Sequence, residues 1–399
     1  MKKTIKDYEL DSKRVIIRVD FNVPIKDGKI IDDNRIISSL KTINYAISHN
    51  AKVILLSHLG RIKTVDDKEK NSLRVVATRL SELLGKKVTF INETKGSEVD
   101  RIISNMQNKD VVLLENTRYE DLDGKKESNN DTELASYWAS LGDVFINDAF
   151  GTIHRSHASN VGIASILPSG IGFLVEEELN ALKVLNNPTR PYIVILGGAK
   201  VSDKLGVIKN LITKADKVII GGAMAFTFLK AKNINTGKSL VEDDYLLFCK
   251  DIIDNYPDKL VLPTDIVVSK KIDSSYPSET ILINDIKDDD IGLDLGAKTV
   301  SEIENILKNA KTVVWNGPLG YYEIPAYQIA TKSILKYLTN NNINTILGGG
   351  DIVAASSELG YKDKISHAST GGGATLEYLE GKKLPGLEVI DNKEWTWRV

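Results

Sequence analysis

The chain has 399 residues, of which 42% are hydrophobic and 27% are charged, and its formal net charge is -2. This length and composition predict a folded protein of two or three domains. The near-zero net charge excludes attraction of nucleic acid by the whole molecule, so any anion must be bound by local groups of Lys and Arg.

The single cysteine, Cys249, excludes an internal disulfide and fits a reducing cytoplasm. Charged residues in the segment 4–9 argue against a signal peptide at the start of the chain. No apolar run reaches the roughly 18 residues that a membrane span needs. We therefore expect a cytoplasmic protein with neither a membrane nor a nucleic acid as partner.

Short apolar runs alternate with helix-like segments along the whole chain. The runs are continuous rather than alternating, which is typical of strands buried on both faces of a parallel sheet. The predicted strands are 15–17, 53–56, 111–114, 144–146, 192–196, 218–220, 280–283, 313–315 and 345–347. The predicted helices include 35–50, 73–84, 174–185, 207–214, 353–359 and 374–379. Alternating strands and helices predict an α/β fold.

The residues that follow the strands differ between the two halves of the chain. Asp, Asn, His and Arg follow the strands of the first half, whereas glycine clusters and lysines follow those of the second. Ligands bind at the carboxyl ends of parallel strands. We therefore expect two doubly wound, Rossmann-like domains, 1–172 and 188–375, with different ligands. A helix within 173–187 joins them, and a cleft lies between the domains.

Two glycine clusters of the second half, 348–350 and 371–373, each precede a helical pattern. Backbone N–H groups at a helix N-terminus bind phosphate, and glycine lets the anion approach closely. Tight turns alone would also use glycine, but four such clusters at strand ends favour phosphate binding. Asp351 follows the first cluster and suits Mg²⁺ beside a phosphate, although it could equally cap the helix.

Lys200 and Lys204 lie four residues apart after the glycine pair 197–198. On the first turns of a helix they would present paired cations to the phosphate loops, whereas a plain surface role is the alternative. A Walker-type loop is not supported, because Lys232 stands where the first glycine before the 237–239 segment should be. A dinucleotide fingerprint is also missing.

The first half offers a set of polar residues that closely follow its strands. Converging guanidinium groups recognise phosphate and carboxylate through paired hydrogen bonds, and carboxylate and amide groups can hold hydroxyls. Each arginine alone would be read as a solvated surface residue. Together they imply a small, hydroxylated polyanion as ligand. The candidates are Asp20, Asn22, Arg35, His58, Arg61, Arg118, His154 and Arg155.

Nine ordered motifs resemble the phosphoglycerate kinase family along essentially the full length of the chain. They are 18–24, 57–61, 114–119, 147–155, 196–204, 292–294, 315–318, 348–351 and 369–373. The resemblance implies a monomer that binds 3-phosphoglycerate on its N-terminal domain and Mg-ADP or Mg-ATP on its C-terminal domain. It also implies that the last residues, 376–399, return to pack on the N-terminal domain.

The resemblance assigns residues to each ligand. The substrate-binding positions are Asp20, Phe21, Asn22, Arg35, His58, Leu59, Gly60, Arg61, Arg118 and Arg155. The nucleotide-binding positions are Lys204, Gly292, Glu323, Gly349, Gly350, Asp351 and Ile352, of which Glu323 holds the ribose and Asp351 the metal. The catalytic positions are Arg35, Lys200, Lys204, Gly371, Gly372 and Gly373.

The implied reaction is reversible phosphoryl transfer from 1,3-bisphosphoglycerate to ADP. The nucleophile is already an anion in both directions, so no general base is expected and the catalytic task is positioning and charge neutralisation. Two ligands on two domains imply closure that brings the reacting atoms together and expels water. We expect the 174–185 helix to act as the hinge.

The chain departs from the usual family pattern at several positions. Ile352 stands where the family has threonine after the glycines, which removes one hydroxyl from the expected phosphate loop. The other departures are Ile62, Ala297 and the pair Tyr321-Tyr322. Two alternatives follow: a binding protein on the same scaffold that has lost catalysis around Ile352, and a dehydrogenase with an atypical dinucleotide site.

Overall fold

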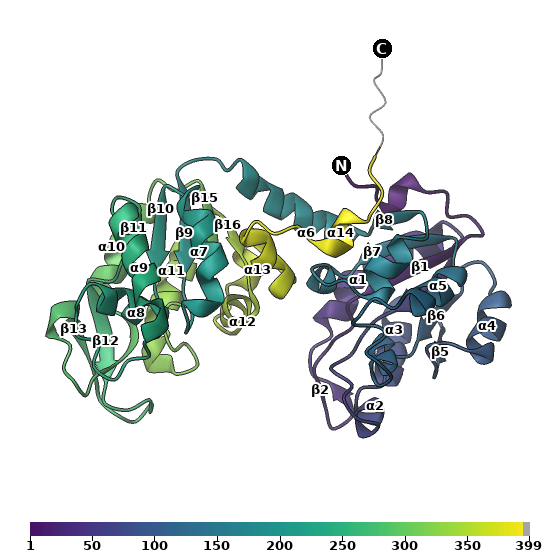
Figure 1. Ribbon diagram of the computed structural model, residues 1–399, viewed down its shortest axis with the longest axis horizontal. Coiled ribbons are helices and arrows are strands. Elements are labelled where there is room, and N and C mark those ends of the chain that lie inside the picture. The colour runs from purple at the N-terminus through teal and green to yellow at the C-terminus, as the bar shows by residue number, and fades with distance from the viewer. Residues whose placement is uncertain (394–399) are drawn as a thin grey trace, which may run out of the picture. The chain divides into compact units, whose positions relative to one another are not determined.

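The computed structural model describes residues 1–393, which form two compact units. Unit 1 consists of residues 1–180 together with the returning segment 383–393, and unit 2 consists of Ala181–Lys382. Each unit has its own six-stranded parallel sheet with helices packed on it (Figure 1). The predicted α/β class with two parallel sheets is confirmed.

The unit 1 sheet has the strand order β5-β6-β4-β1-β7-β8. Its strands are β1 (Arg14–Val19), β4 (Lys52–Leu56), β5 (Val88–Ile91), β6 (Val111–Leu114), β7 (Val144–Asp148) and β8 (Ser169–Ile171), and a hairpin is formed by β2 (Ile25–Lys26) and β3 (Lys29–Ile30). Its helices are α1 (Asn34–Ser48), α2 (Asp66–Lys70), α3 (Arg74–Leu84), α4 (Ser97–Ser104), α5 (Thr132–Ser140) and α14 (Pro385–Glu388).

The unit 2 sheet has the order β11-β10-β9-β15-β16-β17. Its strands are β9 (Tyr192–Leu196), β10 (Lys217–Ile220), β11 (Leu260–Val261), β15 (Thr312–Asn316), β16 (Asn344–Leu347) and β17 (His367–Ala368). A second, antiparallel sheet is formed by β12 (Asp265–Ser269), β13 (Ser278–Leu282) and β14 (Ile291–Leu295). The helices are α7 (Leu205–Ile212), α8 (Met224–Ala231), α9 (Leu246–Asn255), α10 (Ala297–Leu307), α11 (Ile329–Asn340), α12 (Gly350–Glu358) and α13 (Gly373–Leu379).

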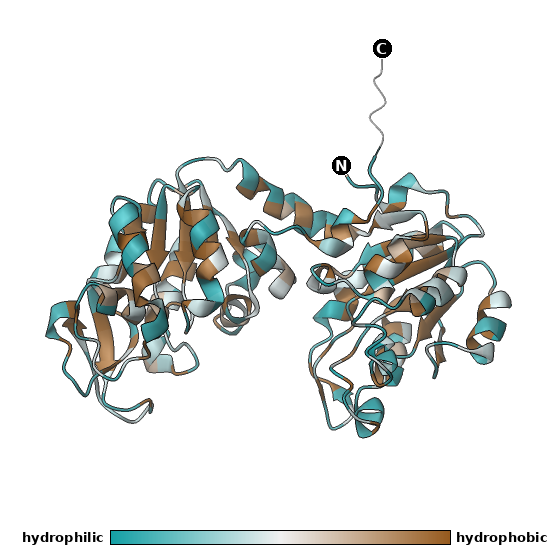
Figure 2. Ribbon diagram, in the orientation of Figure 1, coloured by the Kyte–Doolittle hydropathy of each residue, from teal (hydrophilic) through white to brown (hydrophobic). Residues whose placement is uncertain are grey.

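The central strands are continuous apolar runs because helices cover both of their faces. Every residue of β6, β9 and β15 is buried. Figure 2 shows hydrophobic colour along the strands of both parallel sheets and hydrophilic colour on the outer sides of many helices. Among residues 1–393, no helix is long and apolar enough to cross a membrane.

The 280–283 segment differs from its prediction as a buried parallel strand. The strand that contains it, β13, pairs antiparallel with β12, and most of its side chains are exposed. Its run of β-branched residues predicted a strand but not the partner, since Ile281 packs on a small separate cluster around Phe226 and Ile266 rather than on the main sheet.

Helix α6 (Phe173–Lys183) carries the chain from unit 1 into unit 2, at Asn180 and Ala181. It begins where the last residue of β7 meets it: Asp148 Oδ1 accepts hydrogen bonds from the backbone N–H of Leu174 at 2.9 Å and of Val175 at 3.4 Å. A carboxylate satisfies unpaired N–H groups at a helix N-terminus. This boundary falls within the predicted linker 173–187. The exact predicted limits of the two domains, 1–172 and 188–375, stay predictions.

The C-terminal segment rejoins unit 1 later than the predicted position 376. Helix α13 packs on α7 within unit 2, where Ala374 and Leu379 are buried, so this part of the expected tail belongs to unit 2. From residue 383 the chain returns to unit 1, and Asp391 O accepts a hydrogen bond from Lys3 N at 2.8 Å. Residues 394–399 of the predicted tail lie outside the described part of the chain.

Candidate active site

Cationic and histidine side chains gather at the carboxyl ends of the unit 1 strands. Burial lowers the pKa of the Arg118 guanidinium, and the charges of Arg155 and Arg61 lower it further. Burial also holds the pKa of His58 well below its usual value, with Arg18 and Arg118 as the next causes. These mutual effects indicate that side chains from four different strand ends lie near one another.

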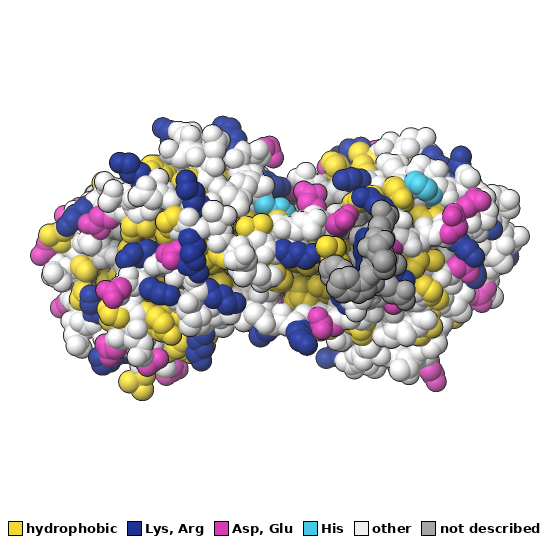
Figure 3. Space-filling model, turned by 90° about the horizontal axis from the view of Figure 1, so that it is seen from above, with side chains coloured by type: hydrophobic (Ala, Val, Ile, Leu, Met, Phe, Trp, Pro, Cys, Tyr) yellow, Lys and Arg dark blue, Asp and Glu magenta, His cyan; other side chains and the backbone are white. Residues whose placement is uncertain are grey.

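The surface seen in Figure 3 is mixed in charge. On the face shown in Figure 3, Lys and Arg side chains are spread among Asp and Glu over both units. Converging guanidinium groups are an arrangement that suits a phosphate or a carboxylate.

Asp20 and Asn22 take different roles after β1. Asp20 Oδ2 forms an ion pair with Arg35 Nη1 at 2.6 Å, and Arg35 lies in the first turn of α1. Asn22 Oδ1 accepts a hydrogen bond from Gly60 N at 2.8 Å. Arg35 is thus held at the edge of the cluster by a carboxylate, while Asn22 holds the loop after β4.

The loop after β4 is fixed from two sides. Arg118 Nη1 donates to Gly60 O at 3.1 Å, and Asn116 Nδ2 donates to Leu59 O at 2.6 Å. Gly60 has a φ of 59°, and a Cβ there would collide with Asn71 Oδ1, so the position requires glycine. The side chains of Leu59 and of Phe21 lie in the unit 1 core, so these two predicted substrate positions offer only backbone groups to a ligand.

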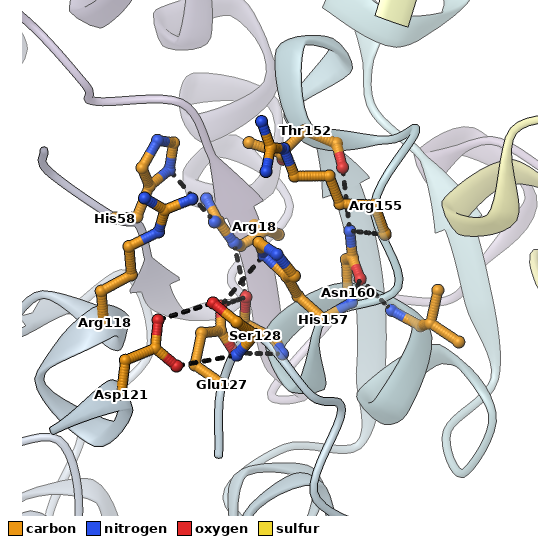
Figure 4. A network of polar contacts seen from close by, with 12 residues as sticks. Arg18, His58, Arg118, Asp121, Glu127, Ser128, Thr152, Arg155, His157 and Asn160 are labelled. Carbon is orange, nitrogen blue, oxygen red and sulfur yellow. Dashed lines mark hydrogen bonds and ion pairs between the residues drawn. The ribbon is translucent and has the colours of Figure 1, made fainter. Parts of the chain in front are cut away.

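The loop after β7 presents His154 and Arg155. Asn160 Nδ2 donates to Arg155 O at 2.9 Å and to Thr152 O at 3.1 Å, which shapes this loop (Figure 4). Burial lowers the pKa of His154 to about 4, with Arg155 as the second cause. His154 is therefore a neutral ring among cations at neutral pH.

Four residues of this cluster were missed by the sequence prediction: Arg18, Glu127, His157 and Ser159. Arg18 and Glu127 are completely buried, and Ser159 lies between them. A charged residue inside the apolar run of β1 was the available signal for Arg18. The partner Glu127 lies in a polar loop, and nothing in that loop's pattern distinguishes it.

In unit 2, one side chain connects Lys204 to the glycine loop 348–350 by hydrogen bonds. Asn316, the last residue of β15, accepts a hydrogen bond from Lys204 Nζ and donates one to Gly348 O. Gly349 caps α12 with a φ of 106°, and a Cβ there would lie 2.5 Å from Asn316 Nδ2. Lys204 is thus tied to the loop that opens α12.

The two predicted lysines have different surroundings. Burial lowers the pKa of Lys204, and the charge of Asp351 opposes this effect. Lys200 is exposed, and its charge contributes to lowering the pKa of Glu242. Lys204 is therefore held against the loop that opens α12, whereas the side chain of Lys200 is exposed.

A cavity of about 430 Å³ lies beside these loops, within unit 2. Its walls include Leu240, Ile272 and Leu293, and a Cβ at Gly292 would collide with the Phe226 ring. Glu323, Asp351 and the buried Asp294 supply the carboxylates of its lining, which also includes Tyr321. An apolar cavity with a few polar groups is typical of a small-molecule site.

The α12 residues after the glycines divide between solvent and core. Asp351 is exposed, whereas Ile352 is completely buried in the unit 2 core. Ile352 therefore offers a ligand only its backbone N–H. Among residues 1–393, no group of three or more His, Cys, Asp or Glu residues could hold a metal by itself. One carboxylate beside phosphate loops fits Mg²⁺ that arrives with phosphate oxygens.

The glycine cluster 371–373 opens α13. Gly372 is the N-cap, with a φ of 50°, and Ser369 Oγ accepts a hydrogen bond from Gly371 N at 3.1 Å. The structure thus brings the predicted residues into two groups, one in each unit. Their individual roles stay predictions.

An anion site of arginines and histidines on one α/β unit, and glycine loops with a lysine and a cavity on the other, are together typical of a kinase for a small anionic acid.

Comparison with known proteins agrees with this class. The family model described as phosphoglycerate kinase matches residues 5–382. A phosphoglycerate kinase of Fusobacterium nucleatum is 56% identical over 398 residues, covering 98% of this chain and 100% of the relative. That of Enterococcus faecalis is 55% identical over 395 residues, with the same coverage. The solved structure of phosphoglycerate kinase from Coxiella burnetii has a TM-score of 0.89 and 37% identity, and covers 98% of each chain.

The chain therefore belongs to the phosphoglycerate kinase family. It is an enzyme of glycolysis, a phosphotransferase of the class EC 2.7.2.3.

Proposed function

We propose that the protein catalyses reversible, Mg²⁺-dependent phosphoryl transfer from 1,3-bisphosphoglycerate to ADP, giving 3-phosphoglycerate and ATP. The observation that carries this proposal is the division of binding groups, with arginines and histidines in unit 1 and glycine loops with Lys204 beside a cavity in unit 2. The first group suits a phosphorylated acid and the second suits a nucleotide.

In unit 1, Arg61, Arg118 and Arg155 would bind the phosphate and carboxylate groups of the acid. His58 lies beside Arg18, with Nδ1 3.3 Å from Arg18 Nη2, and would add a hydrogen bond. Asp20 and Asn22 would hold the hydroxyl, since their side chains accept hydrogen bonds and lie beside the cluster.

In unit 2, the apolar cavity would take the nucleoside and Glu323 its ribose hydroxyls. The backbone N–H groups of Gly349, Gly350 and Ile352 would face the phosphates at the start of α12. Asp351 would hold Mg²⁺, which when bound neutralises phosphate charge.

The chemical step exchanges one phosphorus–oxygen bond for another. A β-phosphate oxygen of ADP forms the new bond as the bond to the carboxylate oxygen of the acyl phosphate breaks. Both oxygens are anions when free, so no proton moves and no general base is needed. Arg35, Lys200, Lys204 and the N–H groups at Gly371, Gly372 and Gly373 would neutralise the transferred group.

The two ligands bind to different units, so transfer requires closure that brings the reacting oxygen and phosphorus to about 3–3.5 Å. We infer that α6, whose residues Asn180 and Ala181 mark the boundary, is the hinge. Solution X-ray scattering would test this: both substrates together should reduce the radius of gyration, and an unchanged radius would remove closure from the proposal. We also infer a cytoplasmic monomer that binds neither nucleic acid nor membrane.

A coupled assay of ATP formation from 1,3-bisphosphoglycerate and ADP tests the proposal. Turnover that requires Mg²⁺ is expected. Intact ADP binding without turnover would instead indicate a binding protein that has lost catalysis. Tight NAD binding without ATP binding would indicate a dehydrogenase.

A further inference from the structure

A buried carboxylate lies beneath the cationic cluster of unit 1. Glu127 has no exposed surface, and its Oε2 and Oε1 accept hydrogen bonds from Ser159 N at 2.9 Å and Ser159 Oγ at 2.5 Å. Burial raises the pKa of Glu127, and the charge of Arg18 opposes that effect. A buried carboxylate is costly unless it is paired, so its position beside Arg18 calls for a role.

Arg18 connects this carboxylate to the ligand-facing histidine. Its Nε donates to Ser159 Oγ at 2.8 Å, its Nη1 donates to Val19 O at 2.5 Å, and its Nη2 lies 3.3 Å from His58 Nδ1. Figure 4 shows Arg18 between Glu127 and His58. All three nitrogens of the guanidinium group are therefore engaged, and its orientation is set.

The chemistry of arginine decides which nitrogen of His58 carries the proton. A guanidinium group only donates hydrogen bonds, so Nδ1 of His58 must accept the bond from Arg18. An accepting ring nitrogen is unprotonated, which leaves the proton of a neutral imidazole on Nε2. Burial and then the charges of Arg18, Arg118, His157 and Arg35 all lower the pKa of His58, so none of these effects favours the imidazolium.

We propose that Glu127, Ser159 and Arg18 are positioning residues that hold His58 as the neutral Nε2–H tautomer. His58 then binds an oxygen of the anionic acid as a hydrogen-bond donor, and it takes up no proton when the acid binds. This inference rests on the proposed function for the identity of the acid, but the tautomer itself can be measured without it.

The Glu127 carboxylate offsets the desolvation of the completely buried Arg18 guanidinium. Burial lowers the pKa of Arg18, and the charge of Glu127 is the first effect that opposes this. His157 also approaches the carboxylate, with Nδ1 at 3.8 Å from Oε1. The Glu127 carboxylate thus stabilises the charge of the buried Arg18. Ser159 Oγ is hydrogen-bonded to both residues and sets the position of Arg18 Nε.

The direct test is ¹⁵N NMR of the His58 ring in the full-length protein between about pH 6 and pH 8, with and without inorganic phosphate. The Nε2–H tautomer is expected throughout. An Nδ1–H tautomer or an imidazolium would overturn the proposal. Because phosphate is the probe, this result stands even if the enzyme shows no turnover with 1,3-bisphosphoglycerate.

Two variants test the positioning residues. Ser159→Ala and Glu127→Gln should each give a mixture of His58 tautomers and raise the KM for 3-phosphoglycerate by about 2- to 10-fold, the effect of one misplaced hydrogen bond. The KM for the nucleotide should not change. Ser128→Ala is the matched control, since Ser128 Oγ donates to Asp121 at 2.6 Å and lies outside the contacts from Glu127 to His58. An unaltered tautomer in folded Glu127→Gln would exclude Glu127 from the role, even if Ser159→Ala failed to fold.

Discussion

Arg35 forms its ion pair with Asp20 while it is also the arginine proposed to neutralise the transferred phosphoryl group. Replacing it in Arg35→Ala should lower the rate of ATP formation by about 10³-fold or more, the effect of losing such an arginine. Lys204→Ala should lose rate comparably, because it removes the cation tied to the α12 loop. A coupled assay at saturating substrates measures both.

Arg79→Ala is the control for Arg35→Ala. Arg79 also forms carboxylate ion pairs, with Asp33 at 2.8 Å and Glu82 at 2.7 Å, and it is similarly exposed. Its loss should leave the rate unchanged. Thermal unfolding must accompany the assay, because Arg35→Ala leaves the largely buried Asp20 carboxylate without its partner. A normal rate in Arg35→Ala would remove this residue from the catalytic step.

Tyr321 is the exposed aromatic ring of the unit 2 cavity lining. It is 44% exposed, and its backbone N–H donates to Leu293 O at 2.8 Å, which fixes it beside Gly292. If it stacks on the base, Tyr321→Val should weaken both ADP and GDP by about 5-fold or more, since stacking tolerates any base. Tyr321→Phe should bind as the wild type does. Isothermal titration calorimetry measures these nucleotide affinities. If Tyr321→Val bound ADP and GDP as tightly as the wild type does, stacking would be excluded.

Single residues were predictable from the sequence where a strand end marked them. Arg61, Arg118 and Arg155 each follow an apolar run, and parallel strands bring such ends together. Glu127 was not predictable, because its partner Arg18 is 109 residues away and only the fold places them together. The position of Ile352 was predictable, but not that its side chain enters the core, where a hydroxyl would not face a ligand.

At the scale of elements, the start of α12 depends on a backbone that only glycine adopts easily. Gly349→Ala would combine a φ of 106° with a Cβ 2.5 Å from Asn316 Nδ2. We expect a loss of about 1–3 kcal/mol in the free energy of unfolding of unit 2 and weaker nucleotide binding. Chemical denaturation without ligand measures the first effect.

Gly350→Ala provides the comparison one residue later. A Cβ at Gly350 would meet no atom within 4 Å, and its φ is not in the left-handed region. An added methyl group there should leave stability unchanged or raise it by about 0.4–1 kcal/mol. Equal destabilisation by both substitutions would show that the strain at Gly349 is not what shapes the loop.

Strands could be predicted from their hydrophobic pattern where they are completely buried. Strands such as β9 and β15 are apolar along their length because both faces are covered, so they were predicted closely. The small sheet was not, since β13 has an exposed face and pairs with β12 through a register that no local pattern encodes. β14 was not predicted either, and its Gly292 is explained only by the fold, because a Cβ there would collide with the Phe226 ring.

At the scale of the molecule, the buried His157 and the half-buried His154 of unit 1 tie its stability to pH. Burial, followed by neighbouring arginines, lowers the pKa of His157 to about 3 and that of His154 to about 4. The unfolded chain takes up protons below about pH 6.5 while the folded protein does not, so the free energy of unfolding should fall as the pH drops. The loss for His157 between about pH 6.5 and pH 5 is at most about 2 kcal/mol, and it is smaller for the partly exposed His154, whose charge is screened by solvent.

Urea denaturation across this pH range tests the linkage. The double variant His154→Gln/His157→Gln should show a shallower dependence than the wild type. His49→Gln removes an exposed histidine at the end of α1 and should keep the wild-type slope. Parallel slopes in all three proteins would assign the acid sensitivity to other groups.

The return of the chain to unit 1 makes the stability of that unit depend on residues from beyond unit 2. Asp391 Oδ2 accepts hydrogen bonds from Tyr8 OH at 2.9 Å and Ser169 N at 3.1 Å. Asp391→Ala should therefore destabilise unit 1 by about 1–3 kcal/mol. Hydrogen exchange should show faster exchange in β1, β7 and β8 but unchanged protection in β9 and β15. Glu388→Ala, which removes an exposed carboxylate of α14, should affect neither set. Faster exchange in both units would mean that the returning segment stabilises the whole molecule and not unit 1 alone.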